Sequence, residues 1–316
     1  MLDLAVIIVS WNVRDYLSEC LSSVYAELNR SRLRGQIWVV DNGSTDGTLA
    51  ILENLFPATQ VIANQHNAGF GAANNQGMIA AGERAPRYLF LLIPDTLVRP
   101  GAMRRMVDFL DAHPEAGMAG ARLVYRDGRF QHSAFAFPGV AQLVFDLWPI
   151  SSRLYDSRLN GRYPRRLYRP DGSPFRVDHP LGAAMMVRRD VAEKTHGFDE
   201  SFHMYCEEID WCWRIHNAGW AIYTVPAAEI VHYGGESTRQ VPARSIVNLW
   251  RSRAQLYRKH HDRVTLAISR RVARVGLMRK AAGAQKPALR EAYEKAAAQW
   301  EPEALLQPQQ GEVVAS

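Results

Sequence analysis

Apolar positions in the first 117 residues alternate between short continuous runs and segments with helical spacing. Such runs are typical of strands buried on both faces, as in a parallel sheet covered by helices. The pattern predicts strands at 4–9, 37–40, 61–63 and 88–93, and helices at 13–28, 45–55, 72–81 and 102–112. Ser44 or Thr45 is the expected cap of the second helix. We therefore expect an α/β fold with a doubly wound, mostly parallel sheet.

The pattern beyond Gly117 is less regular. A turn at Asp127-Gly128 is expected to join strands at 118–125 and 133–137, and 138–178 reads as a long irregular loop. Later expected elements are strands at 182–187 and 221–225 and helices at 191–195, 207–218 and from Ser245 onward. We expect an α/β domain over 1–240, divided into halves at 117, and a helical C-terminal extension over 241–316.

The composition is that of an ordinary globular protein, with 47% hydrophobic and 22% charged residues. No apolar run approaches the roughly 18 residues that cross a bilayer, and no basic segment precedes the first strand, so we expect a cytoplasmic protein. The three cysteines, Cys20, Cys206 and Cys212, lack the spacing of a metal site. We expect them to be packed thiols in a reducing compartment.

The apolar run from Tyr88 ends on Pro94 and Asp95. Because proline cannot donate to a sheet ladder, the strand is expected to end there and to present Asp95 at the carboxyl edge of the sheet. Ligands of open α/β sheets bind at that edge. Asp95 is therefore a candidate ligand for a divalent cation or a sugar hydroxyl, and a turn or helix-capping aspartate is the alternative.

A second acidic residue, Asp41, ends the strand at 37–40 and precedes a glycine-rich turn that contains Gly43. An aspartate there can accept a hydrogen bond from a base or ribose, while a tight turn lets a nucleotide approach the backbone. An Asx-turn is the alternative for Asp41, and a helix cap is the favoured role of Asp46.

The segment 67–77 superficially offers the glycine pattern of a dinucleotide site, but Asn74 stands where the third glycine belongs. The segment also does not follow the first strand, so a nicotinamide-dependent oxidoreductase is disfavoured. Asn67 and Asn74, with the backbone at Gly69, are instead expected to place neutral amides beside an anionic ligand.

An acidic cluster, Glu207, Glu208 and Asp210, opens the helix expected at 207–218. Helical spacing places Glu208 at the head of the apolar stripe, so it is the candidate general base, with a raised pKa beside another carboxylate. We interpret Glu207 and Asp210 as capping residues on a solvent-exposed face of the helix. Asp210 can also form an ion pair with Arg214.

A single histidine, His232, follows an apolar segment and precedes a glycine pair at 234–235. Such a histidine is usually structural. It gains a functional role if the fold brings it to Asp95.

Basic charge is concentrated near the C-terminus. Residues 244–295 contain 14 lysines and arginines against 3 acidic residues, a charge of +11, whereas the rest of the chain carries 24 against 29, or −5. Apolar residues form a rough helical stripe at Val264, Ile268, Val272, Val275 and Met278. A basic amphipathic helix suits an anionic membrane surface, with packing on the catalytic domain or oligomer contact as alternatives. No motif or aromatic platform suggests nucleic-acid binding.

Taken in order, these segments resemble inverting glycosyltransferases of family 2 with the GT-A fold, and bacterial rhamnosyltransferase-like members in particular. The resemblance covers roughly Leu4 to Ser237. It is carried by the segments 6–12, 40–47, 67–71, 94–95, 182–184, 197–200, 207–210 and His232.

The resemblance implies a role for each candidate residue. Asn12, Asp41 and Asn67 match positions that line the nucleotide site. Asp95 matches the last acid of the metal-binding motif, and His232 matches a histidine that completes the shell of Mg²⁺ or Mn²⁺. Glu208 matches the general base, which deprotonates an acceptor hydroxyl for in-line attack on the sugar.

The implied donor is dTDP-rhamnose or, as a second choice, a UDP-sugar. The implied acceptor is a polysaccharide or lipid-linked glycan at the cytoplasmic face of the inner membrane, where the protein is expected to be peripheral. Two positions depart from the family pattern. Ile93 stands where a polar residue is usual, and Glu208 replaces the usual aspartate. The Ile93 departure motivates the rival hypothesis of a non-catalytic sugar-nucleotide-binding or scaffold protein.

Overall fold

The computed structural model describes residues 2–234 and 242–302. These residues form two compact units, one of 2–138 with 150–234 and the other of 139–149 with 242–302. The expected turn at Gly235, the resemblance at 236–237 and the end of the predicted extension beyond 302 lie outside the described residues. The division of the first unit into two halves at residue 117 stays a prediction.

The first unit is built on a central sheet with the strand order β3-β2-β1-β4-β11-β6-β12-β5. Strands β1, β2, β3 and β4 run parallel, β11 is antiparallel to both neighbours, and β12 is parallel to β6. The bounds are β1 Leu4–Ser10, β2 Gly35–Asp41, β3 Gln60–Ala63, β4 Tyr88–Leu92, β5 Thr96–Val98, β6 Ala116–Val124, β11 Ala184–Arg188 and β12 Ala221–His232. The expected mostly parallel sheet is confirmed.

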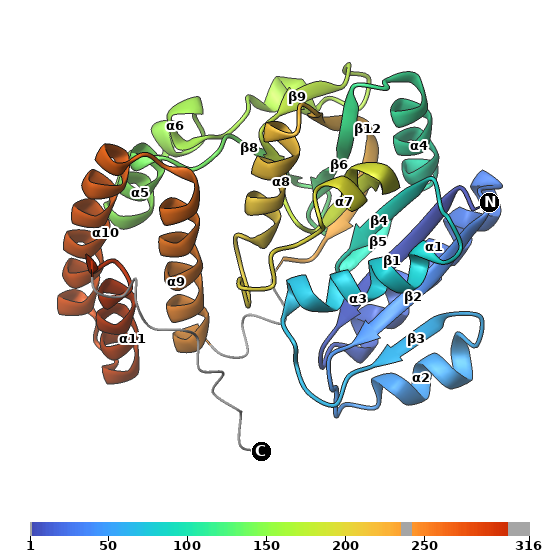
Figure 1. Cartoon of the computed structure of the whole chain (residues 1–316), viewed down its shortest axis with the longest axis horizontal. Coiled ribbons are helices and arrows are strands. Elements are labelled where there is room, and N and C mark those ends of the chain that lie inside the picture. Colours follow the sequence, from blue (N-terminus) through green and yellow to red (C-terminus); the bar gives the residue numbers. More distant parts are fainter. Residues whose placement is uncertain (1, 235–241, 303–316) are drawn as a thin grey trace. The chain divides into compact units, whose positions relative to one another are not determined.

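Helices cover both faces of this sheet (Figure 1). Side chains of β1 alternate between two cores: Leu4, Val6 and Ile8 pack with α1 and α4, whereas Ala5 and Ile7 pack with α3, α7 and α8. A strand buried on both faces therefore reads as one continuous apolar run. The helices are α1 Arg14–Ser31, α2 Thr48–Leu55, α3 Phe70–Gly82, α4 Ala102–Ala112, α7 Arg189–Lys194 and α8 Glu207–Asn217. All three cysteines are buried, as expected.

Several predicted elements differ from the structure. Helix α2 begins at Thr48, and its first turn is held by Asp46, whose carboxylate accepts from the Thr48 backbone N–H at 3.1 Å; neither Ser44 nor Thr45 caps it. Strand β12 continues to His232 instead of ending at 225. The turn at 127–128 leads into β7 (Phe130–Gln131), which pairs with β6, whereas β8 (Ala134–Phe135) pairs with β10 (His179–Pro180).

The segment 138–178 is also more ordered than the predicted loop. It contains α5 Val140–Leu147, α6 Ser152–Tyr155, short 3₁₀ helices at Arg158–Asn160 and Arg165–Tyr168, and β9 Phe175–Val177, which pairs with β12. These elements are too short for their periodicity to stand out in the sequence.

The second unit is helical, as predicted for the C-terminal region. It consists of α9 Pro242–His260, α10 Arg263–Gly283 and α11 Pro287–Ala298, together with α5. The core includes Leu143, Leu147, Trp250, Tyr257 and Trp300. Among the helices of the described residues, none is long and apolar enough to span a bilayer.

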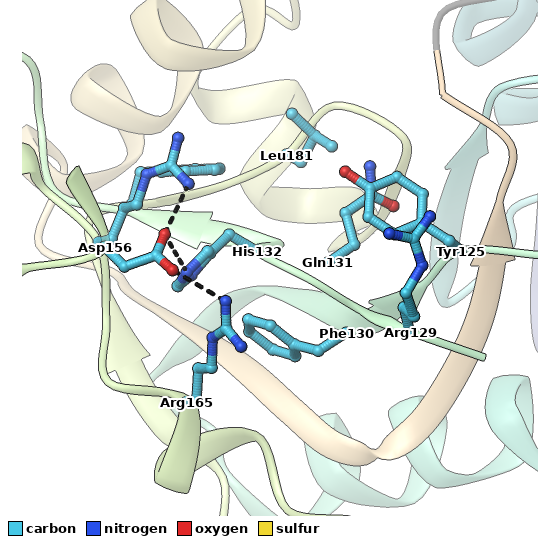
Figure 2. Close-up of a pocket in the computed structure, with 10 residues that line it drawn as sticks. Tyr125, Arg129, Phe130, Gln131, His132, Asp156, Arg165 and Leu181 are labelled. Atoms are coloured by element: carbon cyan, nitrogen blue, oxygen red, sulfur yellow. Dashed lines mark hydrogen bonds and ion pairs between the residues drawn. The ribbon is translucent and has the colours of Figure 1, made fainter. Parts of the chain in front are cut away.

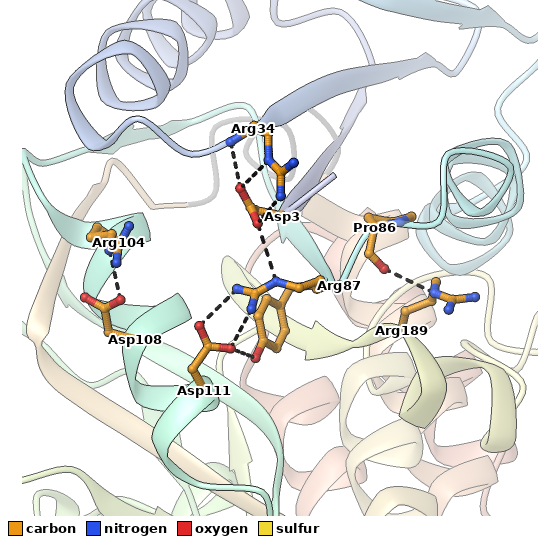
Figure 3. Close-up of polar contacts among 9 residues, drawn as sticks. Asp3, Arg34, Pro86, Arg87, Arg104, Asp108, Asp111 and Arg189 are labelled. Atoms are coloured by element: carbon orange, nitrogen blue, oxygen red, sulfur yellow. Dashed lines mark hydrogen bonds and ion pairs between the residues drawn. The ribbon is translucent and has the colours of Figure 1, made fainter. Parts of the chain in front are cut away.

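A polar network fastens the amino ends of the parallel strands (Figure 3). The Asp3 carboxylate accepts from the Arg34 backbone N–H at 3.0 Å, and Arg87 lies 3.5 Å from Asp3. Arg87 also donates two hydrogen bonds to Asp111 of α4, at 2.9 and 3.0 Å, and the Tyr88 hydroxyl donates to the same carboxylate. The network ties together the starts of β1, β2 and β4, and leaves their carboxyl ends for the site.

Close packing of α3 on the sheet gives a stability prediction. A Cβ atom added at Gly77 would lie 2.5 Å from Ile7 Cγ2, whereas one added at Gly82 meets nothing within 4 Å. We expect Gly77→Ala to lower the free energy of unfolding by about 1–3 kcal/mol through overpacking. Gly82→Ala should be neutral or stabilising by up to about 1 kcal/mol, because alanine favours helix. Urea unfolding of both variants tests this, and equal midpoints would contradict it.

Candidate functional site

The Asp41 carboxylate is a buried acceptor with spare capacity. Asp41 ends β2, opposite Ser10 of β1, and is 1% exposed. One oxygen, Oδ2, accepts from the Ser44 backbone N–H at 2.9 Å, while Oδ1 is buried without a hydrogen-bond partner among the described residues. The Ser10 hydroxyl is likewise buried without a hydrogen-bond partner among the described residues. Buried polar atoms rarely stay unpaired, so this edge fits a ligand that donates hydrogen bonds.

Asn12 shapes the loop that follows Asp41. Its backbone N–H donates to the Ser44 hydroxyl at 2.9 Å, and its side-chain oxygen accepts from the Thr45 backbone N–H at 2.8 Å. These contacts occupy the two residues that were expected to cap α2. Gly43 has a φ of 77°, a left-handed conformation that glycine adopts without strain. Asn12 and Gly43 therefore fix the turn beside Asp41, and their contact with a nucleotide stays a prediction.

A network of side-chain amides surrounds Asn67. Its oxygen accepts from the Gly69 backbone N–H at 2.9 Å and from the Asn42 amide at 3.3 Å. The Asn42 oxygen accepts from Asn64, 2.9 Å away. Neither Asn42 nor Asn64 was predicted as part of the site; the signal in the sequence was an asparagine directly after two successive strands.

Two further predicted positions on this segment have different surroundings. A Cβ atom at Gly69 would lie 2.5 Å from the His203 carbonyl oxygen, so the start of α3 and the segment that leads into α8 lie against each other. Asn74 is 1% exposed, and its amide donates to the Phe70 carbonyl of its own helix at 2.9 Å. Asn74 is thus engaged inside α3, and its role toward a ligand stays a prediction.

Asp95 and His232 face each other across two paired strands. Thr96 of β5 is the partner of His232 in β12, and the Asp95 carbonyl accepts from the Tyr233 N–H at 3.0 Å. His232 Nε2 lies 3.7 Å from Asp95 Oδ2, and both residues are about 5% exposed. His232 and Asp95 therefore lie close together, and this was the condition for a functional role of His232.

The protonation state of His232 suits the binding of a cation. Burial lowers the pKa of His232, against the opposing effect of the Asp95 carboxylate, and so favours the neutral ring. His232 Nδ1 lies 3.1 Å from the Gln131 side-chain oxygen, an acceptor, which places the ring proton on Nδ1. Nε2 is buried without a hydrogen-bond partner among the described residues, and it directs its lone pair toward the carboxylate. A neutral imidazole and a carboxylate are both ligands for Mn²⁺ or Mg²⁺.

Ile93 serves the core instead of the cation. Its side chain packs against the cluster that α1 and α4 form with the sheet, its N–H donates to the Ala183 carbonyl at 3.1 Å, and its carbonyl accepts from the Thr96 hydroxyl at 2.7 Å. In the described part of the chain, no three histidine, cysteine or acidic side chains gather closely enough to hold a metal. The assignment of Asp95 and His232 as metal ligands stays a prediction, and the remaining ligands would be water or phosphate oxygens.

Glu208 reaches the same sheet edge from the start of α8. A Cβ atom added at Gly182 would lie 3.4–3.6 Å from three carbons of the Glu208 side chain, so the two residues pack together. Ala183 follows Gly182 and bonds Ile93, which connects Glu208 to the segment that ends in Asp95. Burial raises the pKa of Glu208, as predicted.

The solvated role predicted for Glu207 and Asp210 is wrong. Glu207 is 4% exposed, and its Oε2 has no hydrogen-bond partner among the described residues. Burial, reinforced by Glu208, raises its pKa to about 8. Asp210 is fully buried and forms the predicted pair with Arg214 at 2.9 Å, and Arg214 also donates to the Gly197 carbonyl at 2.6 Å. Tertiary contacts of α8, which a single helix pattern does not contain, bury these acids.

A cavity of about 620 Å³ lies in the first unit (Figure 2), and neither His232 nor Glu208 is among the residues that line it. Gln131, which contacts His232, and Leu181, which precedes Gly182, both line it. The remaining lining residues are Tyr125, Arg129, Phe130, His132, Phe135, Asp156, Arg162 and Arg165. No member of this group was singled out from the sequence.

Solved structures with this fold are glycosyltransferases. A structure of GalNAc-T7 with UDP, GalNAc and Mn²⁺ matches 94% of this chain and 54% of its own with a TM-score of 0.62 at 15% identity. The mannosyltransferase PcManGT from Pyrobaculum calidifontis, in complex with GDP-Man and Mn²⁺, matches 94% of this chain and 86% of its own with a TM-score of 0.56 at 14% identity. The sheet order and these neighbours show a fold of the GT-A type.

The sequence matches narrow this class. A family model described as glycosyl transferase family 2 matches residues 5–195, more than half of the chain, and the protein belongs to that family. It is 28% identical over 253 residues to the N-acetylglucosaminyl-diphospho-decaprenol L-rhamnosyltransferase of Mycobacterium tuberculosis, covering 76% of this chain and 79% of the relative. It is 24% identical over 241 residues to the rhamnosyltransferase WbbL of Escherichia coli, covering 74% and 84% respectively.

The buried Glu207 gives a prediction about pH. The folded protein keeps a proton on Glu207 up to a pH of about 8, whereas the unfolded chain releases it near 4.5. The free energy of unfolding should therefore fall as pH rises between these values. Glu207→Gln removes this loss, so the variant should gain stability relative to the wild type by up to about 1.4 kcal/mol per pH unit.

Urea unfolding at pH 5, 6, 7 and 8 measures this difference. Glu193→Gln, at an exposed glutamate paired with Arg189, is the matched control and should run parallel to the wild type. A parallel curve for Glu207→Gln as well would contradict the buried, protonated state.

Proposed function

We propose that the protein transfers a sugar, with inversion, from a nucleoside-diphospho-sugar to a lipid-linked glycan. The observation that carries the proposal is the pair of Asp95 and His232, which face each other at the sheet edge beside the packed Glu208. The family match supports the reaction class, and the two rhamnosyltransferase relatives support dTDP-rhamnose as the first donor to test, with a UDP-sugar as the second. The diphosphate-linked substrate of the mycobacterial relative supports the acceptor class.

We assign the donor nucleotide to two loops, the one that follows Asp41 and the one that contains Gly69. The unpaired Asp41 Oδ1 would accept from the base or a ribose hydroxyl, which satisfies a buried acceptor. The left-handed turn at Gly43 would let the nucleotide approach the backbone. We assign the diphosphate of the donor to the loop that follows β4.

Asp95 and His232 Nε2 would hold Mg²⁺ or Mn²⁺ there. When bound, such a cation neutralises charge on the departing nucleoside diphosphate. The Gln131 side chain fixes the histidine tautomer, an arrangement that orients metal-ligating histidines in many proteins.

Glu208 is assigned the proton transfer. A carboxylate whose pKa is raised by burial is a stronger base than an exposed one, and Glu208 packs on Gly182, the neighbour of the cavity residue Leu181. It would take the proton of an acceptor hydroxyl as that oxygen attacks the anomeric carbon from the face opposite the diphosphate. Attack from that face inverts the configuration.

The assignment of Glu208 and Asp95 predicts two different losses. Glu208→Gln should lower kcat by about 10²–10⁴-fold because the general base is gone, with nucleotide affinity nearly unchanged. Asp95→Ala should lower kcat/KM by about 10³-fold or more and also weaken nucleotide binding in the presence of Mn²⁺.

Transfer assays and calorimetric nucleotide titration measure both effects, with Glu193→Gln as the control for charge removal on a helix surface. Retained melting temperatures show that the variants fold. Nucleotide binding without turnover by the wild type across a broad donor panel would support the non-catalytic rival and overturn the proposal.

We also propose that α10 binds an anionic membrane surface. Its apolar stripe does not face the core of the second unit: Val264, Ile268, Val275 and Met278 are 69%, 49%, 55% and 50% exposed. The face that packs contains Ala273, Gly276 and Leu277, and Val272 of the predicted stripe is partly buried. Exposed arginines such as Arg263 and Arg271 lie on the same helix as the stripe. Exposed apolar side chains among arginines match the chemistry of anionic headgroups above acyl chains.

Vesicle sedimentation tests this surface. We expect the wild type to bind phosphatidylglycerol vesicles in a salt-sensitive manner, and replacement of the four stripe residues by serine to weaken binding at least about tenfold. The control replaces Leu55 and Ile79, which are 64% and 75% exposed in the first unit, by serine and should bind as the wild type does. Equal binding by the stripe variant would contradict the proposal.

A further inference from the structure

The cavity beside the candidate site carries an excess of positive charge. Arg129, Arg162 and Arg165 line it together with a single carboxylate, Asp156. Arg165 lies 2.8 Å from Asp156 and Arg162 lies 3.4 Å from it, so one acid serves two arginines (Figure 2). The planar guanidinium group of arginine binds carboxylates and phosphates through the same paired hydrogen bonds. Asp156 therefore occupies the position that a more highly charged anion would take.

Aromatic rings set the direction of these arginines. The Arg165 guanidinium lies 5.3 Å from the centre of the Phe130 ring, and that of Arg162 lies 4.3 Å from Tyr155 and 6.0 Å from Phe135. Stacking on a ring leaves the N–H groups at the guanidinium edge available to an anion. The cations are therefore oriented before any ligand arrives.

His132 is an unsatisfied group in the same cavity wall. Its side chain is 7% exposed, and neither ring nitrogen has a hydrogen-bond partner among the described residues, although Nε2 lies 3.4 Å from Asp156 Oδ1. Burial, followed by repulsion from Arg162, lowers the pKa of His132 to about 4, so the ring is neutral at physiological pH. A buried imidazole whose Nε2 lies 3.4 Å from Asp156 becomes a further donor for an anion that displaces this carboxylate.

The position of the cavity indicates which substrate it meets. It borders Gln131, which holds His232, and Leu181, which precedes the Gly182 contact of Glu208. It does not include the Asp41 turn, which lies on β2, and the sheet order separates β2 from the β6–β7 pair by β1, β4 and β11. The cavity wall is thus one residue in sequence from the Gly182 contact of Glu208, and the cavity lies away from the Asp41 turn, which suits an acceptor site.

We propose that this cavity is the acceptor subsite and that Arg162 and Arg165 bind the diphosphate that joins the acceptor sugar to its lipid. The inference deepens the proposed function and rests on it. The diphosphate displaces Asp156 from the two arginines, and His132 adds a hydrogen bond. The acceptor sugar then lies in the part of the cavity near Leu181, where its hydroxyl meets Glu208. The volume, about 620 Å³, is within the range of small-molecule sites.

Two variants of opposite expected sign test the assignment. The double variant Arg162→Gln and Arg165→Gln should raise KM at least about tenfold for farnesyl-diphospho-N-acetylglucosamine, with the donor KM unchanged. Asp156→Asn frees both arginines and should lower that KM several-fold. Neither variant should change KM for octyl N-acetylglucosaminide, which lacks the diphosphate. The control is Arg169→Gln, at an exposed arginine on the same segment that pairs with Asp171 outside the cavity lining.

The subsite would be overturned if the arginine variant changed KM equally for both acceptors or raised KM for the donor. It would also be overturned if Asp156→Asn raised the acceptor KM as much as the arginine variant does. The last result would show that the three residues only support the local fold.

A binding arm separates this inference from the proposed function. Inorganic pyrophosphate is titrated calorimetrically in EDTA, which removes cation-dependent binding at Asp95. We expect affinity to fall at least about tenfold in the arginine variant and to rise in Asp156→Asn. If the wild type transfers no sugar but pyrophosphate binding follows this pattern, the proposed function fails and the anion site stands. If pyrophosphate binding ignores the arginines, the subsite is wrong even where transfer is observed.

Discussion

The site depends on the break in the sheet ladder at Pro94. Leu92 is the last residue of β4 and Ile93 still donates to Ala183, but proline has no N–H with which to continue. The chain therefore leaves the middle of the sheet and resumes as β5 beside β12, where Asp95 accepts from the Tyr233 N–H. This short crossing brings Asp95 from one strand to His232 of another, although 137 positions separate them in the sequence. Ile93 anchors the crossing by packing into the core, which explains an apolar residue at that position.

Several of the candidate site residues have buried polar atoms without a hydrogen-bond partner among the described residues. In the described part of the chain, they include one oxygen each of Asp41 and Glu207, Nε2 of His232 and both ring nitrogens of His132. Each is costly to a folded chain without a ligand. Local rules of folding are broken most often at functional sites, where substrates make up the missing interactions. The proposed cation pair, nucleotide turn and acceptor cavity would each supply such missing interactions.

The sequence alone predicted the ends of the first four strands to within two residues, because a parallel strand buried on both faces leaves an uninterrupted apolar run. It also placed Asp41 and Asp95 at strand ends, since Gly and Pro punctuate the pattern there. Contacts between distant segments were not predictable. Ser44 and Thr45 fail to cap α2 because they bond Asn12, more than 30 positions away.

The proposed acceptor side of the site was harder to predict from the sequence. β8 pairs with β10 some 45 residues later, and the cavity draws on short elements between 125 and 181 that carry no strong period. The burial of Glu207 depends on how α8 packs, so its polar side chain misled the prediction. Local patterning thus identified the nucleotide side, whereas tertiary packing creates the cavity and tunes the acids.

The central claim is that Asp95 and His232 hold the catalytic cation. It is tested most directly by anomalous scattering at the manganese edge from crystals grown with Mn²⁺ and UDP or dTDP. The account predicts one manganese peak within coordination distance of an Asp95 oxygen, His232 Nε2 and the nucleotide diphosphate. A nucleotide bound at the Asp41 turn with manganese held by other side chains, or with no manganese between Asp95 and His232, would contradict it.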